Sequence, residues 1–418
     1  MPGTTDVMPY LHLSTFASWT ALTQWWSQLA AEAIPARGAD PVVHAEAVRL
    51  TQGLTTDEEK VRALYAFATT QVRYVGLEFG IHSLKPHAVR EVLQRAFGDC
   101  KDKATLLVAL LAEVGIEAQV VLVRTEDNGR LHDSVASLGV FNHAIAYVPS
   151  LNLWLDATAT HHAPRELPEG DAGGVALRIV KSGQAQLEVM PDAQAHAHLQ
   201  AVKLELQVQP DGAALLALDF EMHGRSAAEA RAQLWVDTSR REQMEQFLSA
   251  RFPGIVVQEL ATTGIEPLEE TVKLHVRARA PEWAHRLPDG GLSVQPLRPS
   301  QPYVQMFRVK AGRKQPLVLS HAAEMAHTTW LVPPPGYAVA RLPAPVEEFV
   351  RGADGQPLGQ FSLRCELAAD GALTLRTHLQ IDRRVVPAED VPALLRWLTG
   401  VDNVLRVDVP LRKVTAQP

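Results

Sequence analysis

The chain has 418 residues, which is too long for one typical domain and predicts two or three. Its 46% hydrophobic content is that of a globular protein, and its net charge of −7 gives no electrostatic reason to expect a nucleic-acid partner. Two cysteines, Cys100 and Cys365, are too few for a disulfide framework, so we expect both thiols to be free. No apolar stretch approaches the ~20 residues that span a bilayer, so we expect a soluble chain without a transmembrane segment.

The first ten residues lack the basic and apolar regions of a secretory signal peptide. The short polar start also fits the loss of an upstream segment. Localisation therefore stays open: periplasmic if an export signal has been lost, and cytoplasmic otherwise. Nothing in the sequence indicates an oligomeric state.

Helix signals dominate the first part of the chain. Residues 14–33 are predicted as a helix capped by Ser14, and the capping box at Thr56–Glu59 opens a second helix. A short third helix is expected over residues 88–97. The fourth, over residues 100–114, is apolar nearly all round, which predicts a central, buried helix.

Strand signals follow the fourth helix. Residues 117–125 are rich in β-branched side chains, and residues 126–139 are predicted as a surface loop. Two further strands carry His143 and Asp156. Helices followed by strands indicate the α+β class.

The second half of the chain has a β-rich pattern. Hairpins are predicted at residues 202–220 and 361–381, with turns at 210–212 and 370–371, and each is followed by a helix. A two-fold internal repeat and a chance recurrence of one hairpin type both explain this pattern.

Cys100 is a candidate nucleophile because it stands at the predicted start of the fourth helix. Asp99 is a plausible N-cap, so the thiol falls in the first turn, where unpaired N–H groups and the helix dipole favour a thiolate. Lys101 and Lys103 should add positive charge, partly cancelled by neighbouring aspartates. The alternative is that Cys100 is a small buried apolar residue.

His143 and Asp156 are candidates to complete a catalytic triad with Cys100. A four-residue loop over 148–151 would pair Tyr147 with Asn152 and would place His143 directly opposite Asp156. Opposite residues of an antiparallel pair share a face and are close enough for a carboxylate to orient an imidazole. A one-residue slip would put them on opposite faces.

These residues resemble the transglutaminase-like superfamily, whose members share the papain-like cysteine-peptidase core. The resemblance is carried by residues 98–104 (GDCKDKA), 142–144 (NHA) and 154–158 (WLDAT). Residues 73–76 (RYVG) and 85–87 (KPH) match the segment before the cysteine in bacterial members, in which the core follows an uncharacterised β-rich domain.

The resemblance covers about residues 10–160 and implies a domain layout. Residues 1–50 would be the helical remnant of a preceding domain, and residues 51–165 the papain-like transglutaminase core. Residues 166–197 would form a linker, with one strand near 175–180. Residues 198–418 would form a β-rich C-terminal region of one or two modules.

By that resemblance the protein is an enzyme, a cysteine peptidase or transglutaminase-like acyltransferase, acting on a protein or peptide substrate without a cofactor. Cys100 would attack an amide carbonyl, His143 would hold and return the proton, and Asp156 would fix the imidazole tautomer. The thioester would then pass to water or to an amine, and the sequence does not choose between them. An amidase acting on a small amide and a catalytically silent protein-interaction module are the alternatives.

Other candidate residues have simpler explanations. Gln94 stands six residues before Cys100, where papain-like peptidases place an oxyanion glutamine, but a polar residue on an exposed helix needs no function. Tyr74 and Trp154 are near the presumed cleft, and at most one is expected to touch substrate. Cys365 is expected to be structural. Four histidines lack metal-ligand spacing, so no metal site is predicted: His82, His87, His161 and His162.

Overall fold

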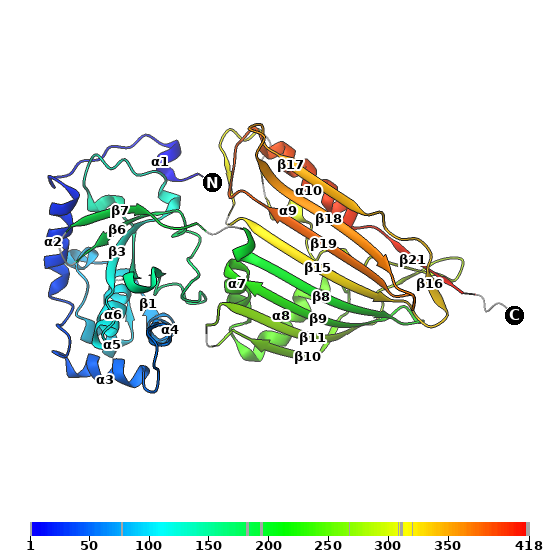
Figure 1. The fold of residues 1–418 in the computed structure, drawn as a ribbon, viewed down its shortest axis with the longest axis horizontal. Coiled ribbons are helices and arrows are strands. Elements are labelled where there is room, and N and C mark those ends of the chain that lie inside the picture. The colour runs from blue at the N-terminus through cyan, green and yellow to red at the C-terminus, as the bar shows by residue number, and fades with distance from the viewer. Residues whose placement is uncertain are drawn as a thin grey trace. The chain divides into compact units, whose positions relative to one another are not determined.

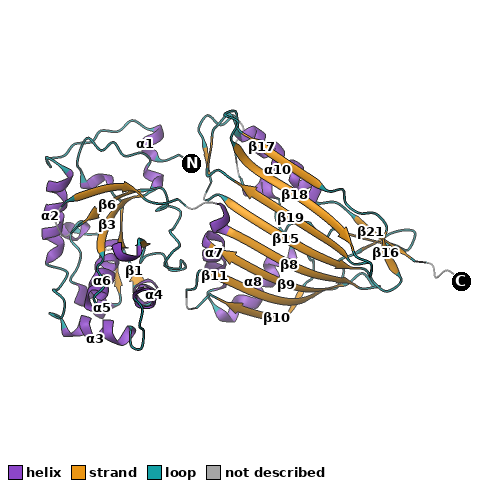
Figure 2. Ribbon diagram, in the orientation of Figure 1, coloured by secondary structure: helices purple, strands orange, loops and turns teal. Residues whose placement is uncertain are grey.

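The computed structural model describes residues 2–76, 78–180, 184–192, 195–266, 268–307, 309, 312–319 and 321–414. The chain divides into two compact units, Pro2–Asp192 and Ala193–Pro418 (Figure 1). Helices and antiparallel strands occur in both, which confirms the predicted α+β class (Figure 2). No helix within the described ranges is long and apolar enough to cross a membrane.

The helices of the first unit follow the predicted caps, with one shift. The helix expected from Ser14 starts at Trp19, because Ser18 accepts the capping hydrogen bond from the Ala21 N–H, whereas Ser14 accepts one from Phe16 in a turn. The predicted capping box at Thr56 and Glu59 is confirmed. The helices are α1 (Thr4–Val7), α2 (Trp19–Ala31), α3 (Pro41–Leu50), α4 (Asp57–Thr70), α5 (Val89–Arg95), α6 (Cys100–Glu113) and the short 3-10 turns η1 (Gly80–Ser83), η2 (Glu126–Asn128), η3 (Leu138–Val140) and η4 (Pro149–Leu151).

One antiparallel sheet of the first unit has the strand order β5-β4-β3-β6-β7. Its strands are β3 (Gln119–Arg124), β4 (His143–Val148), β5 (Leu153–Leu155), β6 (Val175–Ile179) and β7 (Ala185–Val189). The strand expected near 175–180 is therefore present. Residues 166–197, which the sequence predicted as a linker, contribute both β6 and β7 to this sheet.

Helix α6 is central in the first unit, as its apolar sequence predicts. It contacts α3, α4 and α5 as well as β3 and β4, and nearly all of its residues are buried. Strand β2 (Phe97–Gly98), which pairs in parallel with β1 (Arg73–Tyr74), ends two residues before α6 begins. Helix α6 therefore packs against both the helices of the unit and its sheet.

The second unit is built on an eight-stranded sheet with the order β10-β11-β9-β8-β15-β19-β18-β17 (Figure 2). Both predicted hairpins are present, as β8–β9 and β18–β19, and the central pair β8–β15 is parallel. The strands are β8 (Leu199–Val208), β9 (Ala214–His223), β10 (Val256–Thr263), β11 (Thr271–Ala280), β15 (Ala323–Val332), β17 (Val346–Arg351), β18 (Pro357–Leu367) and β19 (Leu373–Ile381).

Shorter elements complete the second unit and its hydrophobic core. Helix α7 follows the first hairpin and α10 follows the second, as the sequence predicts. These elements are η5 (Ala195–His198), α7 (Gly224–Leu234), η6 (Asp237–Ser239), α8 (Arg240–Ser249), β12 (His285–Arg286), β13 (Leu292–Val294), α9 (Tyr303–Met306), β14 (Leu317–Val318), β16 (Tyr337–Val339), β20 (Val385–Val386), α10 (Val391–Leu405) and β21 (Val409–Lys413).

Candidate active site

Cys100 is the first residue of α6, as predicted. The Asp99 side chain accepts a hydrogen bond from the Asp102 N–H at 3.2 Å, and the Asp102 carboxylate accepts one from the Asp99 N–H at 3.3 Å. This reciprocal pair is a capping box, so the helix starts at a defined residue. Cys100 is 8% exposed, so the thiol is largely withdrawn from bulk solvent.

Asp102 also ties the start of α6 to the preceding segment. Its fully buried carboxylate accepts hydrogen bonds from the His87 N–H at 2.8 Å and from Arg95 at 3.0 Å, and it pairs with the His87 ring at 3.0 Å. A Cβ on Gly98 would lie 2.6 Å from the Asp102 Cβ, so only glycine fits there without rearrangement. Gly98 and Asp102 of the motif around Cys100 thus have a structural role, because they position the start of α6.

The two lysines after Cys100, whose charge the sequence predicted to be partly cancelled by neighbouring aspartates, are both buried. Lys101 is buried and paired with the Asp99 carboxylate. Lys103 is fully buried and donates to the Val72 carbonyl. Burial lowers the pKa of Lys103 to about 8, although the charge of Asp156 acts in the opposite direction. Positive charge beside the thiol comes instead from His143.

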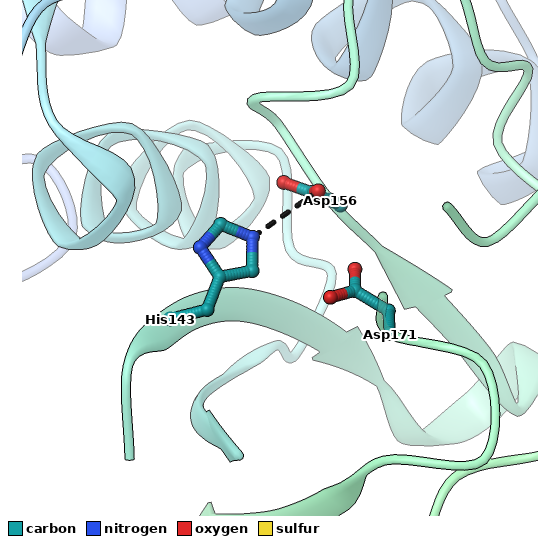
Figure 3. A group of neighbouring side chains, drawn as sticks. All are labelled: His143, Asp156 and Asp171. Atoms are coloured by element: carbon teal, nitrogen blue, oxygen red, sulfur yellow. Dashed lines mark ion pairs between the residues drawn. The ribbon is translucent and has the colours of Figure 1, made fainter. Parts of the chain in front are cut away.

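His143 is the first residue of β4, and Asp156 directly follows β5. The Asn142 side chain bonds both the N–H and the hydroxyl of Thr125, which fixes the chain just before His143. Nε2 of His143 lies 3.2 Å from Oδ2 of Asp156, and both side chains are mostly buried (Figure 3). The two strands therefore bring an imidazole and a carboxylate into contact.

The predicted register of this hairpin is wrong by two residues, although the predicted contact forms. Val148 pairs with Leu153 and Tyr147 with Trp154, so Asp156 is diagonal to His143 rather than opposite it. The loop is displaced because Asn152 adopts a left-handed conformation after a 3-10 turn. A shift of two residues keeps each side chain on its face, so the pair still meets.

The charges of this pair support each other. Burial by itself would lower the pKa of His143, but the hydrogen bond and negative charge of Asp156 raise it to about 11, and side-chain hydrogen bonding with Cys100 adds to this. Burial by itself would raise the pKa of Asp156. The hydrogen bond and charge of His143, with the N–H and hydroxyl of Thr158 at 2.8 Å each, hold it below its usual value. Because Nε2 faces Asp156, Nδ1 is the nitrogen left for the thiol.

Asp171 joins this group, and the sequence did not single it out. It is 2% exposed and lies in the predicted linker. Atoms of His143, Asp156 and Asp171 that could bind a metal lie within 4.8 Å of one another (Figure 3). Burial raises the pKa of Asp171 to about 7, as do the charge and hydrogen bonding of Asp156. His143 and Asp156 are already joined to each other, so the three side chains form a hydrogen-bonded cluster.

Comparisons with known proteins identify a family model that matches part of the first unit. Residues 45–159 match the model of the Transglutaminase-like superfamily. The matched residues lie within the first unit. The matched residues include Cys100, His143 and Asp156, and the resemblance expected from the sequence is confirmed.

A solved structure shares the fold of both units. The crystal structure of a candidate protease from Parabacteroides distasonis aligns over 95% of this chain, with a TM-score of 0.56 and 11% identity. At that identity the match shows the fold alone. The chain spans 59% of the length of that structure. No curated protein matches the chain.

Three further residues of the matched segment were candidates from the sequence: Tyr74, Gln94 and Trp154. Tyr74 is 52% exposed and pairs with Gly98 across β1 and β2. Burial raises the pKa of Tyr74, with a further contribution from the negative charge of Cys100, so this hydroxyl lies in the electrostatic field of the thiol. Trp154 belongs to the buried cluster under the sheet, and Gln94 is exposed on α5.

The remaining sequence candidates lie in hydrogen-bonded or apolar surroundings. The His87 ring pairs with Asp102 and stacks on His82 at 3.9 Å between ring centroids. His161 and His162 follow Asp156 in a loop, and Tyr65 donates to the His162 carbonyl at 3.1 Å. Cys365 packs against the core of the second unit, and burial raises the pKa of its thiol.

Proposed function

We propose that the protein catalyses cysteine-dependent acyl transfer from a peptide or isopeptide amide, with Cys100, His143 and Asp156 as the catalytic triad. The observation that supports the proposal is the position of His143, whose Nε2 lies 3.2 Å from Oδ2 of Asp156 and whose pKa is raised by both Asp156 and Cys100. A thiol, an imidazole and a carboxylate in series form an activated nucleophile.

The roles follow from which atoms face each other. The Cys100 sulfur attacks the amide carbonyl carbon, and the carbonyl oxygen becomes an oxyanion. The backbone N–H of Cys100, in the first turn of α6, is one candidate donor to that oxyanion. As the C–N bond breaks, His143 delivers a proton to the leaving amine, and a thioester with Cys100 remains.

The second half of the reaction regenerates the thiol. Water or an amine attacks the thioester carbonyl, and His143 accepts the proton of the attacking group. The C–S bond then breaks and the sulfur leaves. Asp156 holds Nε2 throughout, so that Nδ1 keeps facing the sulfur. Hydrolysis and amine transfer use the same residues, and they differ only in which nucleophile reaches the thioester.

Acylation of Cys100 by an activated ester tests this proposal. The protein is mixed with a p-nitrophenyl ester, and intact mass and peptide mapping locate the acyl group. We expect one acyl group on Cys100 in the wild type and in Cys365→Ser, and none in Cys100→Ala. The acylated protein is then left in buffer with or without a primary amine. A free acid as product indicates hydrolysis, and an amide of the added amine indicates transfer.

The control variant for this test is His143→Ala. Acylation at the wild-type rate in His143→Ala, or no acylation of Cys100 in the wild type, would contradict the proposal. Either result would favour a protein-interaction module that keeps the fold without its chemistry.

A further inference from the structure

We infer that Asp171 is a positioning residue for the triad, sharing one proton with Asp156 and so holding the Asp156 carboxylate on His143. This inference rests on the proposed function. It extends the site to a side chain in a segment that the sequence predicted to be a linker.

The backbone around Asp171 is held in place. The Asp171 N–H donates to the Pro168 carbonyl at 3.1 Å, and the Gly174 N–H donates to the Asp171 carbonyl at 2.9 Å. A Cβ on Gly174 would lie 2.8 Å from the Arg124 carbonyl, so this turn approaches β3 as closely as glycine allows. The Gly170 carbonyl also accepts a hydrogen bond from Glu126 at 2.9 Å. The turn thus presents Asp171 to the site from a fixed position.

The side chain of Asp171 faces another carboxylate in a dry environment. Asp171 is 2% exposed and Asp156 is 5% exposed. Figure 3 shows both carboxylates beside the His143 ring. Among the described residues, no donor reaches Oδ2 of Asp171. A buried carboxylate oxygen without a donor is costly, and a proton between the two carboxyl groups removes that cost.

The charged and titratable groups around Asp171 favour this shared proton. Burial, Asp156 and Asp127 raise the pKa of Asp171, and the charge of His143 lowers it. Two further groups face the Asp156 side of the pair: Tyr65 of α4 donates to the Asp156 backbone carbonyl at 3.2 Å, and the charge of the buried Lys103 of α6 interacts with Asp156. Asp171 therefore takes the proton, and Asp156 stays ionised toward His143.

The shared proton gives the site a dependence on pH. While Asp171 is protonated it donates to Asp156, and the Asp156 carboxylate is held between Thr158 and His143. Once Asp171 ionises, near pH 7, two buried carboxylates repel each other and added negative charge disfavours the thiolate. An asparagine at position 171 would keep a donor at every pH, whereas an alanine would remove it.

Alkylation of Cys100 by iodoacetamide, measured against pH in the full chain, tests this inference. Cys365→Ser serves as the background, so that Cys100 is the single thiol, and Asp171→Asn, Asp171→Ala and the exposed control Asp133→Asn are compared with it. We expect Asp171→Asn to react at the background rate at pH 6 and about threefold faster than the background at pH 8. Asp171→Ala should react more slowly at pH 6, and Asp133→Asn should match the background. A ratio of Asp171→Asn to background that stays constant with pH would overturn the inference, as would an Asp171→Asn rate as low as that of Asp171→Ala.

Urea unfolding against pH gives a second measurement that does not need a reactive thiol. Because the pKa of Asp171 is raised on folding, the folded state keeps a proton that the unfolded state releases. The background should therefore lose stability relative to Asp171→Asn as pH rises from about 4 to 7. A difference in unfolding free energy between the background and Asp171→Asn that does not change with pH would contradict the shared proton. An inert Cys100 in all variants would overturn the proposed function, and the unfolding result would still decide the role of Asp171.

Discussion

The imidazole of His143 is the residue whose surroundings determine the chemistry of the site. Burial would leave it neutral at physiological pH, and the Asp156 carboxylate reverses this, with a pKa of about 11 as the result. An imidazolium that persists to high pH is a lasting source of positive charge beside a sulfur atom. This charge replaces the one that the sequence assigned to Lys101 and Lys103, both of which are buried.

Replacing Asp156 by asparagine should remove most of this effect. In Asp156→Asn the pKa of His143 should fall from about 11 toward about 6.5, because burial is then opposed only by the smaller contributions of Cys100 and Asp171. NMR titration of the His143 ring measures the change directly. The matched control is Asp219→Asn, which removes the carboxylate paired with the half-buried His275 at 2.7 Å and should leave His143 unaffected. An unchanged His143 titration in Asp156→Asn would contradict this explanation of its pKa.

The buried Lys103 should make folding stability depend on pH. Its pKa is about 8 in the folded chain and about 10.4 in an unfolded one, so the unfolded state binds more protons between these values. Stability contributed by this residue therefore rises by about 3 kcal/mol as pH increases from 8 to above 10. Urea unfolding of the wild type and Lys103→Met at pH 8 and 10 measures the difference. The control variant Lys203→Met, at an exposed lysine, should behave like the wild type. An equal pH dependence of stability in the wild type and in Lys103→Met would contradict the predicted contribution of Lys103.

At the scale of elements, the junction between β2 and α6 sets the position of the thiol. Gly98 ends β2, and the capping box of Asp99 and Asp102 begins α6 at Cys100. The Asp102 carboxylate then fixes Arg95 and His87 on the preceding segment. The position of the Cys100 thiol thus depends on the buried carboxylate of Asp102 and on the glycine at position 98.

Substituting Gly98 by alanine should disturb this junction. Its Cβ would lie 2.6 Å from the Asp102 Cβ, so we expect a loss of about 1–3 kcal/mol in the free energy of unfolding and slower alkylation of Cys100. Denaturant unfolding and iodoacetamide kinetics measure both effects. Gly139→Ala is the control, because the nearest atom to its Cβ would be the Ser137 hydroxyl at 3.6 Å. A Gly98→Ala protein as stable as Gly139→Ala would show that the junction can relax.

Local signals predicted the elements better than their exact pairing. The capping pattern before Cys100 and the apolar run after it predicted the position and burial of α6, because both are properties of neighbouring residues. The register of the β4–β5 hairpin depends on the left-handed Asn152, which the sequence does not reveal, and the prediction missed it by two residues. Asp171 reaches the site through a turn packed against β3, so no local pattern pointed to it.

At the scale of the whole molecule, all four residues of the proposed site belong to the unit Pro2–Asp192. That unit has its own sheet, and β6 and β7 from the predicted linker complete it. The sequence indicated the β-rich character of the second half. It could not predict one eight-stranded sheet with a parallel central pair, because that order depends on contacts between distant segments.

A fragment ending at Asp192 should therefore keep the chemistry of the thiol. We expect residues 1–192 to fold cooperatively and to alkylate at Cys100 at the full-chain rate within about twofold, because each residue of the proposed site is included. Circular dichroism during thermal unfolding and iodoacetamide kinetics measure these properties. A folded fragment with an unreactive thiol would mean that the second unit takes part in the site.

The pH dependence of Cys100 alkylation, in Cys365→Ser with and without His143→Ala, tests the proposed triad most directly. At pH 6 we expect the parent to react about 10- to 100-fold faster than the His143→Ala variant, and the two rates to converge above about pH 9. Peptide mapping should place the added mass on Cys100. Coincident profiles in the two proteins would contradict a Cys100–His143 couple, and with it the proposed acyl transfer.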